Sequence, residues 1–451
     1  MVKAAEPCEL DLKSASELIG KKQLSPVELV SSCFSRIGAL DAKLSAWTLL
    51  DEKGALAAAK RAEKELLAGK RRGPLHGIPV GIKDIFYTKG LRTEAGSRSM
   101  AGFVPSYDAA AVERLKAAGA VILGKTRTTE FAFLDPASTR NPWNTNHTPG
   151  GSSSGSAAAV AARMCPAALG SQTVGSILRP AAYNGVVGFK AQHGRVSAYG
   201  VVPLSWTLDH IGVLARSVED AALVFRAIAG YDSRDPRSLD AAVPGAALKS
   251  RKPPRLGLAK GYFFAKAGAE ARRSTEEAAD KFRKAGAVVT EAVLPPALQT
   301  AAELNRLIMA VEAAAYHKKN FAAKPRLFRP GIAGLIEEGL AVPESKYKEA
   351  LVLRLAACAE MARFLSRFDA VLTPGATGPA PKGLESTGDA AMQRPWSTLG
   401  VPTIALPAGL SRGGLPLGVQ LAGRPFAEDR LLAAARWCEG VLGPGLKPRL
   451  G

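Results

Sequence analysis

Helical segments alternate with short apolar segments along this 451-residue chain, and that alternation limits the possible folds more than any other feature. Residues 109–119 have the pattern of a helix, and the apolar run at 120–123 that follows them has the pattern of a buried strand. Residues 186–189 form another such run. Helices alternating with apolar strands are typical of α/β proteins, in which helices cover a central sheet. We therefore predict an α/β fold built on one central sheet.

No sequence feature divides the chain into separate domains. Residues 1–451 contain no internal repeat and no long low-complexity linker, so we predict a single domain. We expect residues 1–70 to form N-terminal helices. One of them should begin at Ser25, because Ser followed by Pro and then by Glu at the third position is typical of a helix start. Residues 298–368 are again mainly helical, and we expect them to flank a cleft.

The chain is strongly basic. It has 60 Lys and Arg residues against 40 Asp and Glu residues, which gives a formal net charge of +20. A nucleic-acid partner would account for such a charge. However, the basic residues are spread out, and their short clusters are not interleaved with aromatic residues. We interpret the charge as a solvated basic surface and predict no nucleic-acid partner.

Cysteine usage and hydropathy indicate the compartment. The five cysteines are odd in number, far apart and without metal-ligand spacing, which predicts free thiols, a reducing environment and no metal site. No segment reaches the ~20 apolar residues of a membrane span, and the first residues lack the apolar run of a signal peptide. We expect a cytoplasmic monomer or homodimer that does not associate with a membrane.

Two loops rich in glycine and serine are candidates for a catalytic site. Residues 150–156 read Gly-Gly-Ser-Ser-Ser-Gly-Ser, and residues 170–177 read Gly-Ser-Gln-Thr-Val-Gly-Ser-Ile. Glycine permits conformations in which several backbone amides converge, so such a loop can stabilise an oxyanion beside a serine nucleophile. A plain connecting loop or a phosphate site at a helix N-terminus is the alternative, although the Gly-Lys-Ser/Thr ending of a P-loop is missing.

A serine nucleophile needs a base, and histidine is the usual one. The chain has five histidines without a Gly-x-Ser-x-Gly elbow: His76, His147, His193, His210 and His317. We interpret each of them as structural. Lys83 is the better candidate because it lies in the otherwise apolar segment 78–85, where burial would lower its pKa. The sequence leaves a second interpretation open, in which Lys83 forms an ion pair with Asp84.

Three of these segments together resemble the amidase signature family. Gly77–Asp84 matches the pattern G-[IV]-P-[VI]-x-[IV]-K-D, Pro149–Gly155 matches P-G-G-S-S-x-G, and Gly170–Ile177 matches G-x-x-x-x-G-S-[IV]. The similarity is strongest over residues 73–220 and returns at Gly414–Leu421. It implies a single large domain with a central mixed β-sheet covered by helices. It also places the catalytic core at residues 73–235.

The resemblance implies roles for individual residues. Ser176 would be the nucleophile, Ser152 the bridging serine held by a cis peptide bond, and Lys83 the base. The oxyanion hole would be formed by the backbone amides of Thr173, Val174, Gly175 and Ser176. No metal or organic cofactor would be required. Our candidates for the substrate cleft are Phe86, Tyr87, Phe131, Phe133, Trp143, Gly150 and Gly151.

The nucleophile loop departs from the family pattern G-x-D-x-G-G-S-I-R. Gln172 stands in place of Asp, Val174 in place of the first Gly of the pair, and Leu178 in place of Arg, with Arg179 one position later. We hypothesise that the missing Asp and Arg form an ion pair behind the loop in other members. Replacing both the Asp and the Arg would avoid leaving one buried charge without its partner. A Gln172 side chain inside the cleft would contradict this hypothesis.

The resemblance favours one function and leaves two alternatives. The favoured function is a hydrolase that cleaves the C–N bond of a small aryl or alkyl amide, with carbamates, urethanes and esters as further substrates of the same acyl chemistry. One alternative is the glutaminase subunit of a tRNA-dependent amidotransferase, against which the altered nucleophile loop argues. The other is a catalytically dead binding protein, which the presence of all three triad residues disfavours.

Overall fold

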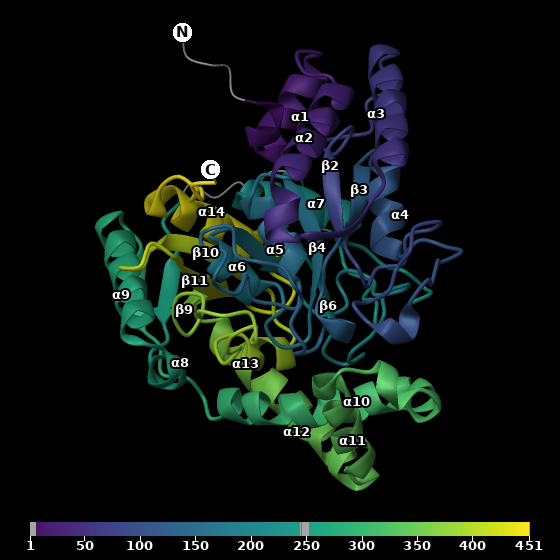
Figure 1. Ribbon diagram of the computed structural model, residues 1–451. Helices are drawn as coiled ribbons and strands as arrows, with labels where there is room; N and C mark the ends of the chain where they lie inside the picture. Colours follow the sequence, from purple (N-terminus) through teal and green to yellow (C-terminus); the bar gives the residue numbers. More distant parts are fainter. Residues whose placement is uncertain (1–5, 244, 246–251, 451) are drawn as a thin grey trace.

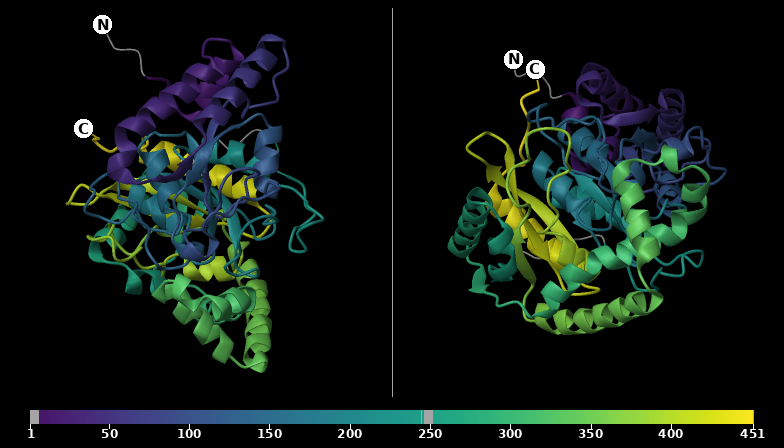
Figure 2. Two further views of the ribbon diagram at one scale, coloured as in Figure 1. Left: turned by 45° about the vertical axis from the view of Figure 1, so that its right-hand side comes forward. Right: turned by 60° about the horizontal axis from the view of Figure 1, so that its bottom comes forward.

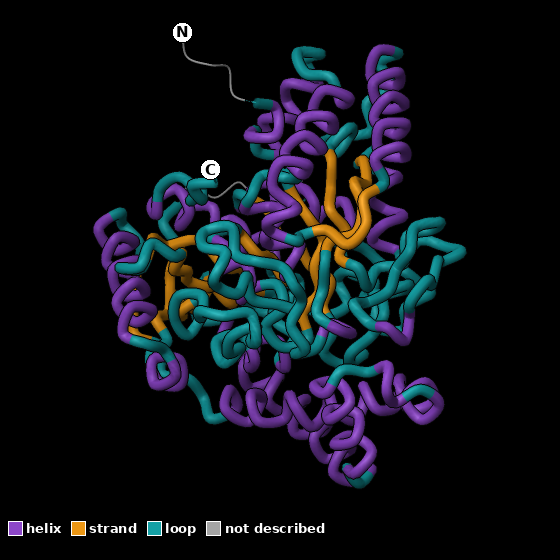
Figure 3. The backbone as a smooth tube through the Cα atoms, in the orientation of Figure 1, coloured by secondary structure: helices purple, strands orange, loops and turns teal. Residues whose placement is uncertain are grey.

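A single mixed sheet of 11 strands forms the centre of the molecule (Figures 1 and 3). The computed structural model describes residues 6–243, 245 and 252–450. Within them the strand order is β1-β3-β2-β4-β6-β5-β10-β11-β9-β7-β8. The prediction of a single α/β domain with a central mixed sheet is therefore confirmed.

The strands are short, between four and eight residues each. They are β1 (Trp47–Leu50), β2 (Pro79–Lys83), β3 (Val121–Thr126), β4 (Ala167–Gln172), β5 (Val187–Lys190), β6 (His210–Ala215), β7 (Arg255–Leu258), β8 (Val288–Glu291), β9 (Ala370–Pro374), β10 (Thr403–Leu410) and β11 (Pro416–Ala422).

Helices connect the strands and cover the sheet. Those of the described residues are α1 (Leu12–Gly20), α2 (Pro26–Leu44), α3 (Glu52–Leu67), α4 (Ala110–Ala117), α5 (Ser154–Ala161), α6 (Leu178–Asn184), α7 (Val218–Ile228), α8 (Gly261–Lys266), α9 (Ala269–Lys284), α10 (Ala297–Ala323), α11 (Pro330–Ala341), α12 (Glu344–Leu365), α13 (Arg394–Thr398) and α14 (Glu428–Leu442). Helices α1 to α3 gather at one end of the molecule, and α10 to α12 gather at the opposite end (Figures 1 and 2).

Strand β2 lies between two parallel neighbours. It pairs with β3 on one side and with β4 on the other, and all five of its residues are buried. Strand β4 in turn pairs with β6 in the antiparallel sense. Parallel strands in the middle of a sheet are usually covered on both faces, which keeps them away from solvent. The last residue of β2, Lys83, is therefore inside the protein.

The N-terminal region differs from its expected all-helical form. Between α2 and α3 the chain forms β1, which pairs with β3 at the edge of the sheet. Four residues are too few for a periodic pattern, so the strand has no clear sequence signal. Helix α2 begins as predicted: the Ser25 hydroxyl accepts hydrogen bonds from the amides of Val27 and Glu28, and the Glu28 carboxylate accepts one from the Ser25 amide.

Helix α5 packs unusually close to its surroundings. All eight of its residues are buried, and most are alanine, glycine or serine. A Cβ atom placed on Gly155 would overlap the carbonyl oxygen of Ala46 and the backbone of Arg127. Small side chains let the helix backbone approach the strands. This fixes the position of the loop that precedes α5, which contains Ser152.

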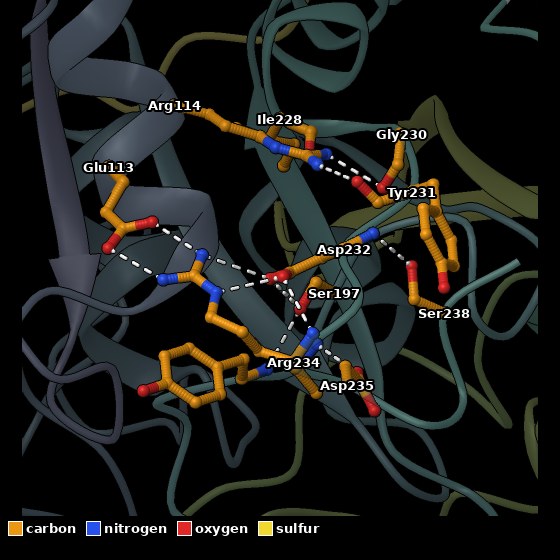
Figure 4. Close-up of polar contacts among 12 residues, drawn as sticks. Glu113, Arg114, Ser197, Ile228, Gly230, Tyr231, Asp232, Arg234, Asp235 and Ser238 are labelled. Atoms are coloured by element: carbon orange, nitrogen blue, oxygen red, sulfur yellow. Dashed lines mark hydrogen bonds and ion pairs between the residues drawn. The ribbon is translucent and has the colours of Figure 1, made fainter. Parts of the chain in front are cut away.

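The segment after α7 is held to α4 by arginine (Figure 4). Arg114 on α4 donates hydrogen bonds to the carbonyl oxygens of Ile228 and Gly230, both at 2.9 Å. Arg234 pairs with Asp232 at 2.9 Å and with Glu113 on α4 at 2.6 Å. This network therefore ties the last residues of the predicted catalytic core, at 228–234, back to a helix near its start.

None of the helices in the described part of the chain combines the length and the apolar character that crossing a membrane would need.

The capping box of α2 leads to a stability prediction. Ser25→Ala should lower the free energy of unfolding by about 1 kcal/mol, because it removes the acceptor for the first-turn amides. It also removes the 2.5 Å hydrogen bond from the Ser25 hydroxyl to Glu63 on α3. Urea titration measures the change. Ser35→Ala, on the exposed face of the same helix, is the matched control and should leave the midpoint unchanged; equal midpoints for both variants would contradict the prediction.

Candidate active site

Lys83 is the centre of a buried polar cluster. Its Nζ atom lies 2.7 Å from the Ser152 hydroxyl and 2.8 Å from the Ser171 hydroxyl. The side chain is fully buried. Burial lowers the pKa of Lys83 from 10.5 to about 7, and the charge of Asp209 opposes this only in part. At neutral pH a large share of Lys83 is therefore an uncharged amine, which can accept a proton.

The neighbouring carboxylate does not neutralise Lys83. Asp84 is the first residue after β2, and its Oδ1 atom lies 3.6 Å from Nζ of Lys125. The sequence left open whether Lys83 is a buried base or the ion-pair partner of Asp84. The structure pairs Asp84 with Lys125 instead.

Ser152 lies in the loop that ends at the start of α5. The peptide bond between Gly151 and Ser152 is cis, as the resemblance implied. The Ser152 carbonyl accepts a hydrogen bond from the Thr129 amide at 3.3 Å. The following residue, Ser153, donates its amide to the carbonyl oxygen of Ser176 at 3.2 Å. This last bond joins the two glycine- and serine-rich loops, which are separate in the sequence.

Ser176 lies at the boundary between the interior and a cavity. Its exposed fraction is 7%, whereas Ser152 is fully buried. Among the hydrogen bonds of the described residues, none joins the two hydroxyls and none is donated by the amides of residues 174–176. These amides are thus free to donate to an oxygen atom that approaches Ser176.

Gln172 holds the nucleophile loop from behind. Its side-chain oxygen accepts hydrogen bonds from the amides of Ile177 and Leu178, both at 2.9 Å. Its side-chain nitrogen donates to the Ser397 hydroxyl at 2.9 Å. The residue is fully buried and does not line the cavity. A Gln172 side chain inside the cleft would have contradicted our hypothesis that other members have an Asp–Arg ion pair behind the loop. The structure does not show Gln172 there.

A second buried group supports the same loop from another side. The Thr173 hydroxyl donates to Asp209 at 2.6 Å, and Asp209 also accepts the amides of Leu204 and Ser205. Burial raises the pKa of Asp209, and the hydrogen bond from Thr173 is the largest opposing effect. Asp209 thus connects the loop of Ser176 to the turn that precedes β6.

The cavity beside Ser176 has a volume of about 440 Å³. Its wall combines the nucleophile loop, the segment at 385–394 and one side of α10, which contributes Asn305 and Met309. Of the aromatic cleft candidates, only Phe133 lines this cavity. The helical region at 298–368, which we expected beside a cleft, supplies part of its wall.

The remaining cleft candidates lie elsewhere. Tyr87 and Phe131 line a second cavity of about 460 Å³ together with Tyr316. The Phe86 ring is fully buried in the core. Trp143 donates its indole N–H to the carbonyl oxygen of Asn184 at 2.9 Å. Gly150 and Gly151 belong to the Ser152 loop, and a Cβ atom on Gly150, whose φ is +77°, would contact Tyr183 and Pro180.

The histidines have structural environments. Ring nitrogens of His76, His147, His193 and His210 lie within hydrogen-bonding distance of backbone carbonyl oxygens, and the His317 ring packs 4.3 Å from that of Phe131. None of them lines the cavity beside Ser176. Within the described ranges there is also no group of three or more His, Cys, Asp or Glu residues that could hold a metal ion.

Sequence reasoning missed several residues of the site. Ser171 contacts Lys83 because β4 extends to Gln172, whereas we expected a loop from residue 170 onward. Its position inside the second glycine- and serine-rich segment was the available signal. Asp209 lies inside the region of strongest family similarity, but sequence reasoning assigned it no role, because its contact with Thr173 joins distant segments. Asn305 had no signal, since its contact with Thr398 also joins distant segments. The sequence marks Arg179 only as an arginine shifted by one position.

Comparison with known proteins identifies the family. The Amidase family profile matches residues 28–432. This match shows that the chain belongs to the amidase family. It is an amidohydrolase-type enzyme that acts on C–N bonds.

The similar proteins have names that describe different activities. A glutamyl-tRNA(Gln) amidotransferase subunit of Geobacter metallireducens is 37% identical over 95% of this chain and 96% of its own length. A solved structure described as a vestigial protein complex, which reveals the origins of an s-triazine catabolic enzyme, is 30% identical with a TM-score of 0.91 over 98% of this chain and 100% of its own. The peptide amidase of Stenotrophomonas maltophilia is 30% identical with a TM-score of 0.84 over 98% of each chain.

The lowered pKa of Lys83 predicts the pH dependence of activity. The uncharged amine is the form that accepts a proton, so kcat/KM should rise about tenfold per pH unit below pH 7 and level off above pH 8. Initial rates on a chromogenic anilide between pH 5 and pH 9 measure this profile. A rate that is constant or falls across this range would contradict the role of Lys83 as base.

Gln172 allows a test of loop positioning. Gln172→Ala leaves the buried amides of Ile177 and Leu178 without an acceptor, which costs about 1–3 kcal/mol for each. We expect a lower urea midpoint and a lower kcat with a smaller change in KM, measured on the same anilide. Gln23→Ala, at an exposed position, is the control. Wild-type kcat in Gln172→Ala would show that the loop does not depend on this side chain.

Proposed function

We propose that the protein hydrolyses the C–N bond of a small amide through an acyl-enzyme on Ser176, with Ser152 and neutral Lys83 as the proton relay. The observation that carries the proposal is the buried Lys83 amine, 2.7 Å from the Ser152 hydroxyl and without a carboxylate partner within 4 Å among the described residues. A fully buried lysine with a pKa near 7 is typical of a group that exchanges protons during catalysis.

Acylation follows from this arrangement. Lys83 accepts the proton of Ser152, and Ser152 accepts the proton of Ser176 as the Ser176 oxygen attacks the amide carbon. Because the two hydroxyls are not hydrogen-bonded to each other at rest, a side-chain rotation of one serine completes the relay. The backbone amides of Thr173, Val174, Gly175 and Ser176 stabilise the oxyanion of the tetrahedral intermediate.

The leaving group departs by the reverse proton movement. Ser152 donates its proton to the amine nitrogen as the C–N bond breaks, and Lys83 returns a proton to Ser152. Water then attacks the acyl-enzyme with the same relay as base, which releases the carboxylic acid and regenerates Ser176. No step requires a metal or an organic cofactor. The same relay would serve a carbamate or an ester, since each has an acyl carbon and a leaving heteroatom.

A second candidate is the subunit of a tRNA-dependent amidotransferase that releases ammonia from an amide donor. The names of the curated relatives support it more directly than they support a free-standing amidase. Because those relatives are named as subunits, this candidate implies that further chains assemble with the protein. The two candidates share the chemistry at Ser176 and differ in the fate of the released amine.

Substitutions in the triad test the shared chemistry. Ser176→Ala should lower kcat by a factor on the order of 10⁴ or more, as removal of a nucleophile does in other serine hydrolases. Lys83→Met should give a loss of similar size, because it keeps the apolar packing and removes the base. Lys60→Met on the exposed side of α3 is the control. Full activity in a folded Ser176→Ala protein would exclude the proposed mechanism.

Purification from the native host separates the two candidates. A free-standing amidase should elute alone and hydrolyse small amides at the same rate before and after a high-salt wash. An amidotransferase component should co-elute with other chains and transfer ammonia from glutamine to glutamyl-tRNA only in their presence. Each outcome selects one candidate, and the triad variants above apply to both.

A further inference from the structure

Arg179 is a buried positive charge in the wall of the substrate cavity. It lies three residues after Ser176 and lines the same cavity. Its exposed fraction is only 3%. Burial lowers its pKa, but an arginine side chain remains charged in proteins because its intrinsic pKa is so high.

The hydrogen bonds of Arg179 leave part of its donor capacity unused. Its terminal nitrogens donate to the carbonyl oxygens of Gly388 and Gly151 and, at 3.0 Å, to the hydroxyl of Thr387. A guanidinium group has five N–H donors. The Nε atom has no partner in the described part of the chain. All three acceptors are neutral, so they orient the group without balancing its charge.

No carboxylate lies within 4 Å of Arg179 in the ranges that the structure describes. Of the other charged residues in the cavity wall, Arg306 is paired with Glu338 at 2.6 Å outside it. Arg394 and Asp389 act on Arg179 only at longer range and with opposite effects. Glu385 is the remaining acidic residue of the wall. A buried charge without a partner is costly unless a ligand supplies the opposite charge.

We propose that Arg179 binds a carboxylate group of the substrate, so that the enzyme prefers amides whose acyl part carries a second, negatively charged carboxyl group. This inference rests on the proposed function, because it names the substrate class of the Ser176 site. Arg179 and Ser176 share one wall of a cavity of about 440 Å³. The acyl part that joins the two groups is therefore short, as in the monoamides of small dicarboxylic acids.

Three pairs of compounds test the preference: malonamate, succinamate and glutaramate, each against its neutral diamide. Within each pair, one compound has a carboxylate where the other has an uncharged amide of the same shape. Calorimetry on Ser176→Ala measures binding without turnover. The best monoamide should bind about 100-fold tighter than its diamide, and adding Arg179→Gln should reduce this ratio to below about threefold, since removing one partner of a buried ion pair costs several kcal/mol.

Controls separate charge recognition from a structural role. Arg363→Gln removes the same charge from the exposed side of α12 and should leave the ratio unchanged. Arg179→Lys keeps the charge and should restore part of it. In the active enzyme, Arg179→Gln should lower kcat/KM for the monoamide far more than for the diamide. An equal loss of kcat/KM for the monoamide and the diamide would show that Arg179 only supports the loop, and it would overturn the proposal.

The proposal and the function on which it rests fail in different ways. Tight monoamide binding that depends on Arg179, without turnover by the wild type, would retain the carboxylate site and reject the hydrolase mechanism. Turnover that requires Ser176 but shows no preference within any pair would retain the mechanism and reject the carboxylate site.

Discussion

The burial of an uncharged lysine at the end of β2 is the constraint on which the rest of the site depends. Removing Lys83 from water is what lowers its pKa to about 7, and that burial requires a strand with neighbours on both edges. The hydroxyls of Ser152 and Ser171 then form hydrogen bonds with the Lys83 amine, and neither hydroxyl carries a negative charge that would stabilise its protonated form. A carboxylate in either position would stabilise the protonated form and raise the pKa again.

The two loops depend on different kinds of support. The Ser152 loop is fixed by close packing, because α5 consists of small residues such as Gly155 that approach the backbone of Ala46. The loop of Ser176 is fixed by buried side chains that accept or donate hydrogen bonds, namely Gln172 and Thr173. Packing defines the position of the relay, and hydrogen bonding defines the orientation of the amides that face the substrate.

The sequence predicted the parts of the fold that have local signals. The apolar segment 78–85 that contains Lys83, the capped start of α2 and the α/β class all follow from periodicity and capping residues. Strands β7 and β8 were missed, and the residues of β8 are largely exposed, so they lack an alternating pattern. For the site, the triad candidates came from motifs, whereas the wall of the cavity required contacts between segments more than 100 residues apart, such as Asn305 with Thr173.

The division of the cavity wall has a consequence for how such an enzyme changes over time. The proton relay belongs to strands and loops between residues 79 and 215, while α10 contributes its wall residues from the helical connection between β8 and β9. An exchange of that helical connection, residues 297–365, would replace one side of the pocket in a single event and leave Lys83 and its serine partners in place. The architecture therefore allows the substrate range to evolve through exchange of residues 297–365, while the residues that carry out the reaction stay unchanged.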